Sequence, residues 1–467
     1  MSEGPPRTHT PEPTTGAAAA LLERFAPDEY LREGTYAATR LPVDRATTLL
    51  PEAYRSPTYH ALEQRRVFAG GWVGIGFTEQ VDAPGDVLVG HVAGRSVLVT
   101  RGRDGALRAF HNVCRHRAAE LVREDCNLRR FRCPYHSWTY SLEGRLLGAP
   151  LFEGSDIPRE QRAVFDTSHV AGFDPDEMGL LPIRVDSWAH LVFVDLDGGA
   201  PRLATWLGDL PERLAGYRLD ETRVHGRRPY AIAANWKLIA ENFMEYYHLP
   251  WVHPELAKVS RVDDHHRWQG PGMYTGMCTT PVTQDEDSGW TALRPVPGLD
   301  GDDAVSGRFV HVFPNVSLSV LPNHVFTMLL TPTGAGSTHE QTALALHPEA
   351  GDGSDVTDAV AKLLRFWDHV NREDIEIVER VQRGIANEAY TGGRMCYRFE
   401  EPLHRFQNMV IDRMVGVDRI PGRHERDGTA LFTTAGHTPS ADAGHTTADA
   451  RSAAGTTTGG RTTEVSA

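Results

Sequence analysis

The 467-residue chain has few cysteines, no long apolar run and a deficit of positive charge, and each shortage excludes a class of protein. Five cysteines in a chain of this length do not form a disulfide framework, so we expect the thiols to be buried or to bind metal. No apolar run approaches the roughly 18 residues that a membrane-spanning helix needs. A formal net charge of -14 argues against a nucleic-acid-binding surface.

The first residues are polar and rich in proline, without the basic start and apolar core of a secretory signal. We therefore expect a cytoplasmic protein that binds neither membrane nor nucleic acid. Residues 1–20 are rich in Pro, Thr and Ala, and residues 431–467 in Thr, Ala, Gly and Ser, which predicts two disordered tails. The length of 467 residues is enough for more than one core, and 40% hydrophobic residues is an ordinary value for a globular protein.

Between the tails, the hydrophobic pattern predicts a mixture of helices and antiparallel strands, which is the α+β class. A helix is predicted from Ser56 to Phe68, followed by short apolar runs separated by Gly, Asp and Pro from Trp72 onward, which are typical of a strand meander. Further strands are expected around 181–196, 230–233 and 309–330. Helices are expected over 203–217 and 356–385.

The first strand-rich region contains a cluster of cysteines and histidines. Cys114-x-His116 is followed, after 16 residues, by Cys133-x2-His136. Two thiolates and two imidazoles on two turns could hold a tetrahedral zinc ion, or a [2Fe-2S] cluster with two cysteines on one iron and two histidines on the other. The order of the pairs and the Ser-Trp that follows resemble a Rieske domain, which implies the cluster. Imidazole ligation raises its potential to about -150 to +300 mV, which makes it a mild one-electron carrier.

A second cluster lies in the stretch from Asn235 to Pro254, NWKLIAENFMEYYHLPWVHP. Residues 235–248 can form a helix that places Glu245 and His248 on one face. Pro250 is expected to end this helix, because the residue before a proline is pushed out of helical angles. The break would let His253 turn back toward the metal that His248 binds.

Two histidines need one carboxylate to complete the facial triad of a non-haem iron, which leaves positions open for oxygen and substrate. We expect this acid to be Asp374, because its neighbours on the predicted helix over 356–385 form an apolar stripe and a buried carboxylate needs a partner or a metal. Glu373 is predicted to face His369, Glu376 and Arg380 on a wetter face, where an ordinary salt bridge explains it.

Together, Cys114-x-His116-x16-Cys133-x2-His136, the segment NWK-x3-EN with Glu-x2-His-x4-His, and the Glu373-Asp374 pair resemble the catalytic subunit of Rieske non-haem iron oxygenases. The resemblance implies a small antiparallel β Rieske domain, residues 69–170, inserted in a helix-grip catalytic domain. Residues 21–68 would be the helical N-terminal part of that catalytic domain, and residues 171–430 the part that holds the mononuclear iron.

The resemblance also implies the cofactors and partners. The cofactors would be a [2Fe-2S] cluster on Cys114, His116, Cys133 and His136 and a mononuclear Fe(II) on His248, His253 and Asp374, with O2 as co-substrate. Glu245 would connect the two centres across subunits of a homotrimer. No Gly-x-Gly-x-x-Gly motif follows a strand, so electrons would come from a separate NAD(P)H-dependent reductase, with or without a ferredoxin.

Glu at position 245, in the text ENFMEYYH, resembles the branch of the family that acts on quaternary ammonium compounds such as choline, carnitine and glycine betaine. We therefore expect a monooxygenase or dioxygenase that hydroxylates or N-demethylates a small organic substrate. An aromatic cage for a trimethylammonium head could come from Tyr246, Tyr247, Trp251, Trp268 and Trp290. The alternatives are an aromatic-ring hydroxylating dioxygenase and, from another class, a Rieske electron carrier without oxygenase activity.

Overall fold

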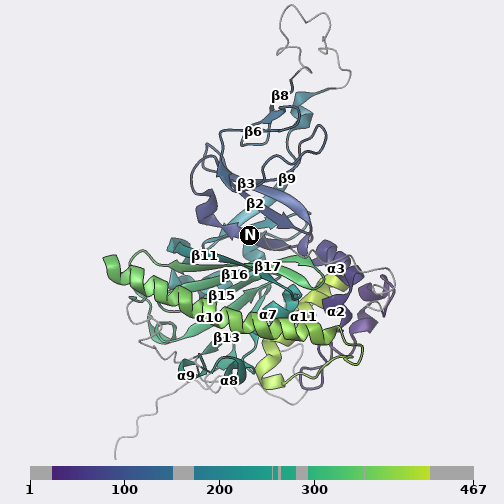
Figure 1. Ribbon diagram of the computed structural model, residues 1–467, viewed down its shortest axis with the longest axis vertical. Coiled ribbons are helices and arrows are strands. Elements are labelled where there is room, and N and C mark those ends of the chain that lie inside the picture. The colour runs from purple at the N-terminus through teal and green to yellow at the C-terminus, as the bar shows by residue number, and fades with distance from the viewer. Residues whose placement is uncertain are drawn as a thin grey trace, which may run out of the picture. The chain divides into compact units, whose positions relative to one another are not determined.

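The computed structural model describes residues 24–150, 173–254, 256–260, 265–279, 293–351 and 353–420. Both predicted tails, residues 1–20 and 431–467, lie outside these residues. Three antiparallel sheets and a set of helices make up the described chain (Figure 1), which confirms the α+β class. No helix among the described residues has the length and apolar character needed to cross a bilayer.

The predicted meander forms the first sheet, in which the strand order is β1-β10-β9-β4-β3-β2-β5. The turn between β3 and β4 uses Gly105 at a φ of +77°, a backbone conformation that glycine adopts without strain. The strands are β1 (Trp72–Phe77), β2 (Asp86–Val92), β3 (Arg95–Arg101), β4 (Leu107–His111), β5 (Cys126–Asn127), β9 (Pro182–Trp188) and β10 (Leu191–Asp195).

A small three-stranded sheet follows the cysteine and histidine motifs and has its own core. It consists of β6 (Phe131–Arg132), β7 (Thr139–Tyr140) and β8 (Leu146–Gly148). Its buried side chains include Phe131, Trp138 and Tyr140, and both Cys114 and Cys133 are buried among them. This second, smaller core fixes the two cysteines in place.

The largest described sheet has the order β11-β17-β16-β15-β14-β13-β12. Side chains on a strand alternate between faces, so each strand serves two layers. On β16, Phe326 and Met328 point to one face, and Thr327 and Leu329 to the other. The strands are β11 (Arg223–Ile232), β12 (His265–Arg267), β13 (Tyr274–Thr279), β14 (Gly307–Val312), β15 (Val316–Val320), β16 (Val325–Gly334) and β17 (Ser337–Leu346).

Three helices contact the large sheet, and the first of them contacts both of the others: α7 (Trp236–Met244), α10 (Gly353–Ile385) and α11 (Tyr397–Val415). Figure 1 shows α10 running across the front of this sheet beside α7. The prediction of a long helix over 356–385 is therefore confirmed, with three further residues at its start. The other α-helices are α2 (Glu52–Arg55), α3 (Pro57–Glu63), α5 (Leu203–Leu207), α6 (Leu210–Arg213), α8 (Leu249–Val252) and α9 (Leu256–Val259).

The remaining helical turns are short. The predicted helix from Ser56 to Phe68 is α3 continued by a π-helical turn, η3 (Gln64–Phe68). The 3-10 turns are η1 (Glu29–Leu31), η2 (Glu33–Tyr36), η4 (Thr78–Val81), η5 (Pro175–Met178), η6 (Ala215–Tyr217), η7 (Leu219–Glu221) and η11 (Gly301–Ala304).

The prediction of one helix over 203–217 is wrong, because α5, α6 and η6 divide this segment. Gly208 ends α5 with a φ of +62°, and a Cβ at this position would collide with the backbone of Pro271 and Gly272. The segment of Pro271 and Gly272 lies so close that position 208 must be a glycine, and the positive φ of this glycine ends the helix. The helical spacing of the nearby leucines gives no sign of this turn.

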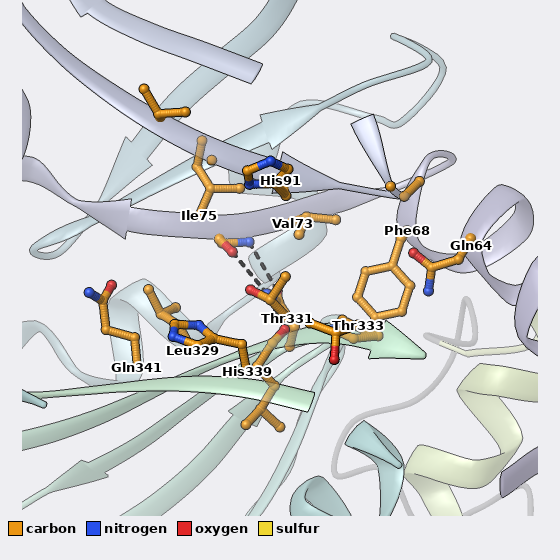
Figure 2. A pocket seen from close by; sticks show the side chains of 18 of the residues that line it. Gln64, Phe68, Val73, Ile75, His91, Leu329, Thr331, Thr333, His339 and Gln341 are labelled. Atoms are coloured by element: carbon orange, nitrogen blue, oxygen red, sulfur yellow. Dashed lines mark hydrogen bonds between the residues drawn. The ribbon is translucent and has the colours of Figure 1, made fainter. Parts of the chain in front are cut away.

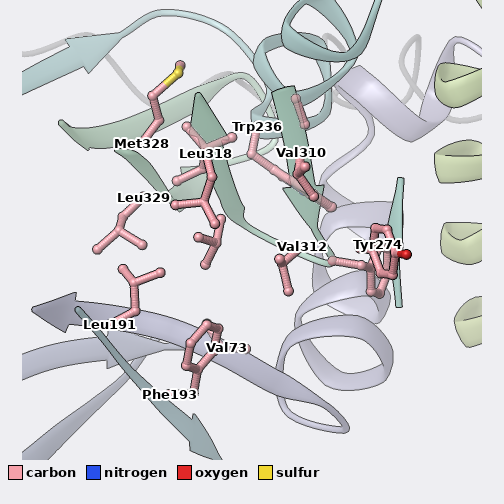
Figure 3. Close-up of a cluster of buried hydrophobic side chains, with 14 of the residues drawn as sticks. Val73, Leu191, Phe193, Trp236, Tyr274, Val310, Val312, Leu318, Met328 and Leu329 are labelled. Carbon is pink, nitrogen blue, oxygen red and sulfur yellow. The ribbon is translucent and has the colours of Figure 1, made fainter. Parts of the chain in front are cut away.

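The first sheet packs on the face of the large sheet that carries Thr327 and Leu329. Figure 3 shows Val73, Leu191 and Phe193 of β1 and β10 facing Leu318 and Leu329 of the large sheet. Asn315 joins the layers, because its side chain accepts a hydrogen bond from Gly74 N at 3.0 Å and donates one to Gly74 O at 2.8 Å. The helices and the first sheet therefore take opposite faces of the large sheet.

A buried ion pair anchors the start of α7. Lys237 Nζ lies 2.7 Å from Glu63 Oε1, and both side chains are fully buried. Trp236 Nε1 donates to the other oxygen of Glu63 at 2.8 Å. Burial lowers the pKa of Lys237 and the charge of Glu63 opposes this shift, so the pair depends on both partners.

We predict that Lys237→Ala lowers the free energy of unfolding by about 3–5 kcal/mol, because it leaves the carboxylate of Glu63 buried without its cation. Arg380→Ala, which removes an exposed pair with Glu376, is the control and should cost no more than about 1 kcal/mol. Urea unfolding followed by tryptophan fluorescence measures both. Equal midpoints for the two variants would contradict the assignment of Lys237 as an anchor.

Candidate functional site

The Cys114–His116 and Cys133–His136 motifs form two tight turns. Ala118 N donates to Cys114 O and Ser137 N to Cys133 O, each at 3.0 Å. Ala118 and Ser137 both have positive φ, which curls each turn around its cysteine. The two turns face each other, since the rings of His116 and His136 lie 4.6 Å apart in an edge-on arrangement.

The donor set of these turns, two thiolates and two imidazoles, fits a [2Fe-2S] cluster with the cysteines on one iron and the histidines on the other. His136 Nδ1 is buried and accepts no hydrogen bond within the described chain. Burial and the neighbouring Cys133 raise the pKa of the Cys114 thiol, a cost that bound iron would offset. Cys126 lies on β5 and packs against the same small core.

The second predicted group converges. His248, His253 and Asp374 bring their ligand atoms within 4.8 Å of one another. Nε2 of His253 lies 2.8 Å from Asp374 Oδ1, and Nε2 of His248 lies 3.6 Å from the same oxygen. His253 is 2% exposed, so the group is closed to bulk water on that side. Two imidazole nitrogens and one carboxylate oxygen can together bind a divalent metal ion.

The local chain reaches this geometry by an earlier break than the sequence predicts. Helix α7 ends at Met244, and Glu245 is extended with φ -119° and ψ 158°. Pro250 does not end a helix. It lies in the first turn of α8, where its missing N–H costs nothing. The prediction of a helix as far as His248 is therefore wrong, and so is the prediction of a break at Leu249-Pro250, because the break comes before both histidines and a helical turn joins them.

Glu245 causes this break and holds His248. Its carboxylate accepts hydrogen bonds from the backbone N–H groups of Tyr247 and His248, which replace the helical bonds that α7 no longer makes. The same carboxylate contacts His248 Nδ1. Glu245 thus orients an imidazole whose Nε2 points at Asp374. Its side chain lines the cavity beside the three converging groups.

Glu373 also contacts a histidine, against the expectation of an ordinary salt bridge on the wetter face of the helix. Its Oε2 lies 2.8 Å from His253 Nδ1, while its Oε1 lies 3.4 Å from His369 Nε2. Burial lowers the pKa of His253, but hydrogen bonds and charge from Asp374 and Glu373 prevail and raise it to about 9. Metal-free protein therefore holds a proton on His253 at neutral pH.

A second buried acid lies behind the site. Glu340 on β17 accepts a hydrogen bond from Asn371 Nδ2 at 2.7 Å, and Asn371 is one helical turn before Asp374. Burial raises the pKa of Glu340 to about 8, partly opposed by the hydrogen bond and reinforced by the charge of Asp374. The protonated carboxyl adds no negative charge near the site at pH 7. No periodicity in the sequence distinguishes Glu340 from its strand neighbours.

The three converging groups open into a cavity of about 70 Å³ with a mostly apolar wall. The aromatic residues of this wall are Phe243, Phe309, Phe326 and Trp367. Phe326 and Trp367 stack with ring centroids 4.6 Å apart. The cage expected from Tyr246, Tyr247, Trp251 and Trp268 is wrong, because none of these four lines the cavity. Trp290 lies outside the described residues.

Four further histidines are hydrogen-bonded in the described part of the chain and lie outside the converging group. His311, His324 and His404 are buried. His265 lines the cavity, and its Nε2 lies 3.1 Å from Ser260 Oγ.

A larger cavity of about 750 Å³ lies between the first sheet and the large sheet. Figure 2 shows Val73, Ile75 and His91 on one wall and Leu329, Thr331 and His339 on the other. None of the predicted metal-binding residues lines it. Although this cavity is the larger of the two, it lacks the metal-binding groups that the reaction site needs.

Comparison with known proteins matches both parts of the chain. Residues 71–158 match the Rieske [2Fe-2S] domain, and residues 219–416 match the ring hydroxylating alpha subunit (catalytic domain). These two domains define the catalytic alpha subunit of an oxidoreductase that uses O2, with a Rieske cluster and a mononuclear iron as its cofactors. The chain belongs to the Rieske non-haem iron oxygenases. Alpha subunits of this kind take a small-molecule substrate and receive electrons from a separate protein.

Individual relatives cover most of the chain. The oxygenase subunit of glycine betaine monooxygenase from Pseudomonas aeruginosa is 29% identical over 405 residues, which is 80% of this chain and 90% of the relative. The chloroplastic choline monooxygenase of Arabidopsis thaliana is 28% identical, over 79% of this chain and 84% of the relative. The structure of the quaternary ammonium Rieske monooxygenase CntA with L-carnitine has a TM-score of 0.65 at 25% identity, covering 81% of this chain and 97% of CntA.

The proton on His253 gives a pH-dependent prediction for metal binding. A divalent ion must displace this proton, so we expect the affinity of metal-free protein for Co²⁺ to rise about tenfold per pH unit up to about pH 9 and then to level off. Calorimetry at pH 7.5 in two buffers of different ionisation enthalpy should show release of close to one proton. The ion pairs of protonated His253 likewise stabilise the metal-free fold below about pH 6.5 and are lost as the pH rises through 9. Metal binding without proton release at pH 7.5 would contradict this prediction.

Proposed function

We propose that His248, His253 and Asp374 hold the mononuclear iron and that Cys114, His116, Cys133 and His136 hold the Rieske cluster. The observation that carries the proposal is the convergence of three ligand atoms from residues 248, 253 and 374 within 4.8 Å. When bound, the cluster supplies single electrons and the iron activates dioxygen. The chain is then a Rieske oxygenase that hydroxylates or N-demethylates a small organic substrate.

The side chains around the proposed metal site have two roles: they orient the metal ligands, and they exclude water from the cavity. Asp374 balances the charge of a bound cation between the two imidazoles, and Glu245 fixes the ring of His248. Phe243, Phe309 and Met328 keep the wall of the cavity apolar, which excludes water from the reacting position. Asn371 and Ser319 offer hydrogen-bonding groups at the same wall, where they can orient a bound substrate.

Glu245 is also the group we propose as the connection between the two metal centres. The cavity with His248 and His253 contains no described side chain from residues 69–150, so the Cys and His turns of the same chain do not reach it. A homotrimer, in which these turns of one subunit lie beside Glu245 of the next, would supply the missing contact. Glu245 is 9% exposed, which leaves part of its carboxylate available to such a neighbour.

We further propose the cytoplasm as the location and an NAD(P)H-dependent reductase, with or without a ferredoxin, as the electron source.

We propose a quaternary ammonium compound as the substrate, and therefore a monooxygenase outcome. The relatives are named for glycine betaine and choline, and CntA for quaternary ammonium compounds. In the described lining, the cavity has two carboxylates, Glu245 and Asp374, with no Lys or Arg. Aromatic faces such as those of Phe309 and Trp367 attract a cation that lacks N–H groups, by about 0.5–2 kcal/mol each.

The first test of the proposal is the iron content. Wild-type protein should contain three irons per subunit, and His248→Ala, His253→Ala double-variant protein should contain two, keep the red-brown Rieske spectrum and lose turnover. Cys133→Ala should lose the Rieske spectrum instead, because it removes a cluster ligand. Metal analysis and visible absorption measure these quantities. A double variant that keeps its third iron and full turnover would exclude the assigned ligands.

The second test concerns the charge of the substrate. Protein reduced with stoichiometric dithionite, freed of excess reductant and then mixed with O2, should convert choline, glycine betaine or carnitine in a single turnover. The uncharged carbon isostere of choline, 3,3-dimethylbutan-1-ol, should react at least roughly tenfold less efficiently, since it loses the attraction to the aromatic faces. Mass spectrometry identifies the products. Formation of a ring diol from a simple aromatic, with none of the ammonium compounds consumed, would instead favour the dioxygenase alternative.

A further inference from the structure

We propose that Glu373 is a positioning residue that grips Nδ1 of His253 and so aims Nε2 of the same ring at the mononuclear metal. This inference rests on the proposed function, in which His253 is an iron ligand. It reverses the expectation that Glu373 only forms a salt bridge on the wetter face of α10.

The geometry places two consecutive residues of α10 on the two nitrogens of one imidazole. Glu373 Oε2 lies 2.8 Å from His253 Nδ1, and Asp374 Oδ1 lies 2.8 Å from His253 Nε2. Neighbouring residues on a helix project about 100° apart, so their carboxylates can approach opposite edges of a ring that lies between them. The ring of His253 is thereby fixed relative to the axis of α10 and not only to its own short helix, α8.

The contact also decides which nitrogen is available to a metal. A neutral imidazole carries one proton. A carboxylate that accepts a hydrogen bond from Nδ1–H keeps this proton on Nδ1, so the lone pair of Nε2 is free to bind a metal. Glu245 makes the equivalent contact to Nδ1 of His248. Each proposed histidine ligand therefore has its own acid behind it. One acid comes from the end of α7 and the other from α10, 128 residues later in the chain (373 − 245).

The hydrogen bond between Glu373 and His253 differs from an ordinary surface pair because one of its partners is buried. His253 is 2% exposed and Glu373 keeps 27% of its side chain exposed, so the hydrogen bond lies at the boundary of the core. The second contact of Glu373 is to His369, whose side chain is 62% exposed, at a longer distance of 3.4 Å. An exposed pair of this kind contributes little, so His369 does not explain why the carboxylate points inward.

The test measures metal affinity, not turnover alone. Full-length protein with its Rieske cluster, but without the mononuclear metal, is titrated with Co²⁺ against a competing chelator, and the visible ligand-field bands of the bound ion are recorded. We expect Glu373→Ala to weaken Co²⁺ binding about 10- to 100-fold and to alter the bands. Glu373→Gln retains a hydrogen-bond acceptor and should recover part of the lost affinity. Glu376→Ala, three residues further along the exposed side of α10, is the matched control and should bind as wild type does.

The same titration separates failure of this inference from failure of the proposed function. Asp374→Ala should abolish Co²⁺ binding at the mononuclear site if the ligand assignment is correct. If Asp374→Ala abolishes binding while Glu373→Ala and Glu376→Ala both match wild type, the positioning role is excluded and the ligands stand. If Asp374→Ala binds as wild type, the ligand assignment itself fails. An unchanged Rieske spectrum and thermal midpoint confirm that each variant is folded, and Glu373→Gln serves if Glu373→Ala is not.

Discussion

The site depends on the point at which helix α7 ends. His248 and His253 both follow Met244, so the direction in which the chain leaves α7 places both rings. Glu245 sets this direction by taking extended backbone angles and accepting hydrogen bonds from the N–H groups of Tyr247 and His248 with its own carboxylate. One side chain thereby ends the helix, starts the turn that leads to α8 and holds the ring of His248. The chemistry of the cavity and the local fold thus depend on the same residue.

A buried polar framework keeps the end of α7 in position. At its start, Lys237 pairs with Glu63 of α3 in full burial. One turn further on, Glu241 accepts hydrogen bonds from Tyr54 Oη at 2.7 Å and Gln407 Nε2 at 3.0 Å. Burial raises the pKa of Glu241 to about 7, against the effect of these bonds, so the helix is held by groups that tolerate little displacement. Since α2, α3 and α11 all contribute to this framework, the N-terminal helical residues stabilise a site that they do not touch.

The sequence predicts those features that depend on local spacing. The Cys and His pairs lie on two tight turns, and their separations can be read directly from the chain. The spacing along α10 also points Asp374 toward the site, but the expected contrast in burial is small, because 22% of the Asp374 side chain is exposed against 27% for Glu373. The end of α7 could not be predicted, because a glutamate that caps its own following residues has no periodic signal. The contact of Glu373 with His253 spans 120 residues and depends on how α10 crosses α8. The aromatic wall of the cavity was missed because it requires knowing which face of β14 and β16 turns toward the helices.

The two faces of the large sheet explain how one chain can keep two redox centres apart. Alternation along β16 sends Phe326 and Met328 to the cavity, and Thr327 and Leu329 to the layer that carries the first sheet. Thr327 Oγ1 lies 2.8 Å from His190 Nε2, and Asn315 forms hydrogen bonds that join the same layer to Gly74.

The Cys and His turns therefore belong to the part of the chain that packs on the face of the large sheet away from its helices. A carrier on that side cannot reach the cavity of its own chain by a small shift of side chains, because a packed sheet lies between them. In the arrangement that we propose, electrons for the site at His248 therefore pass around the sheet or come from another subunit. Glu245 lies on the helix side of the sheet, where such a subunit would have to dock.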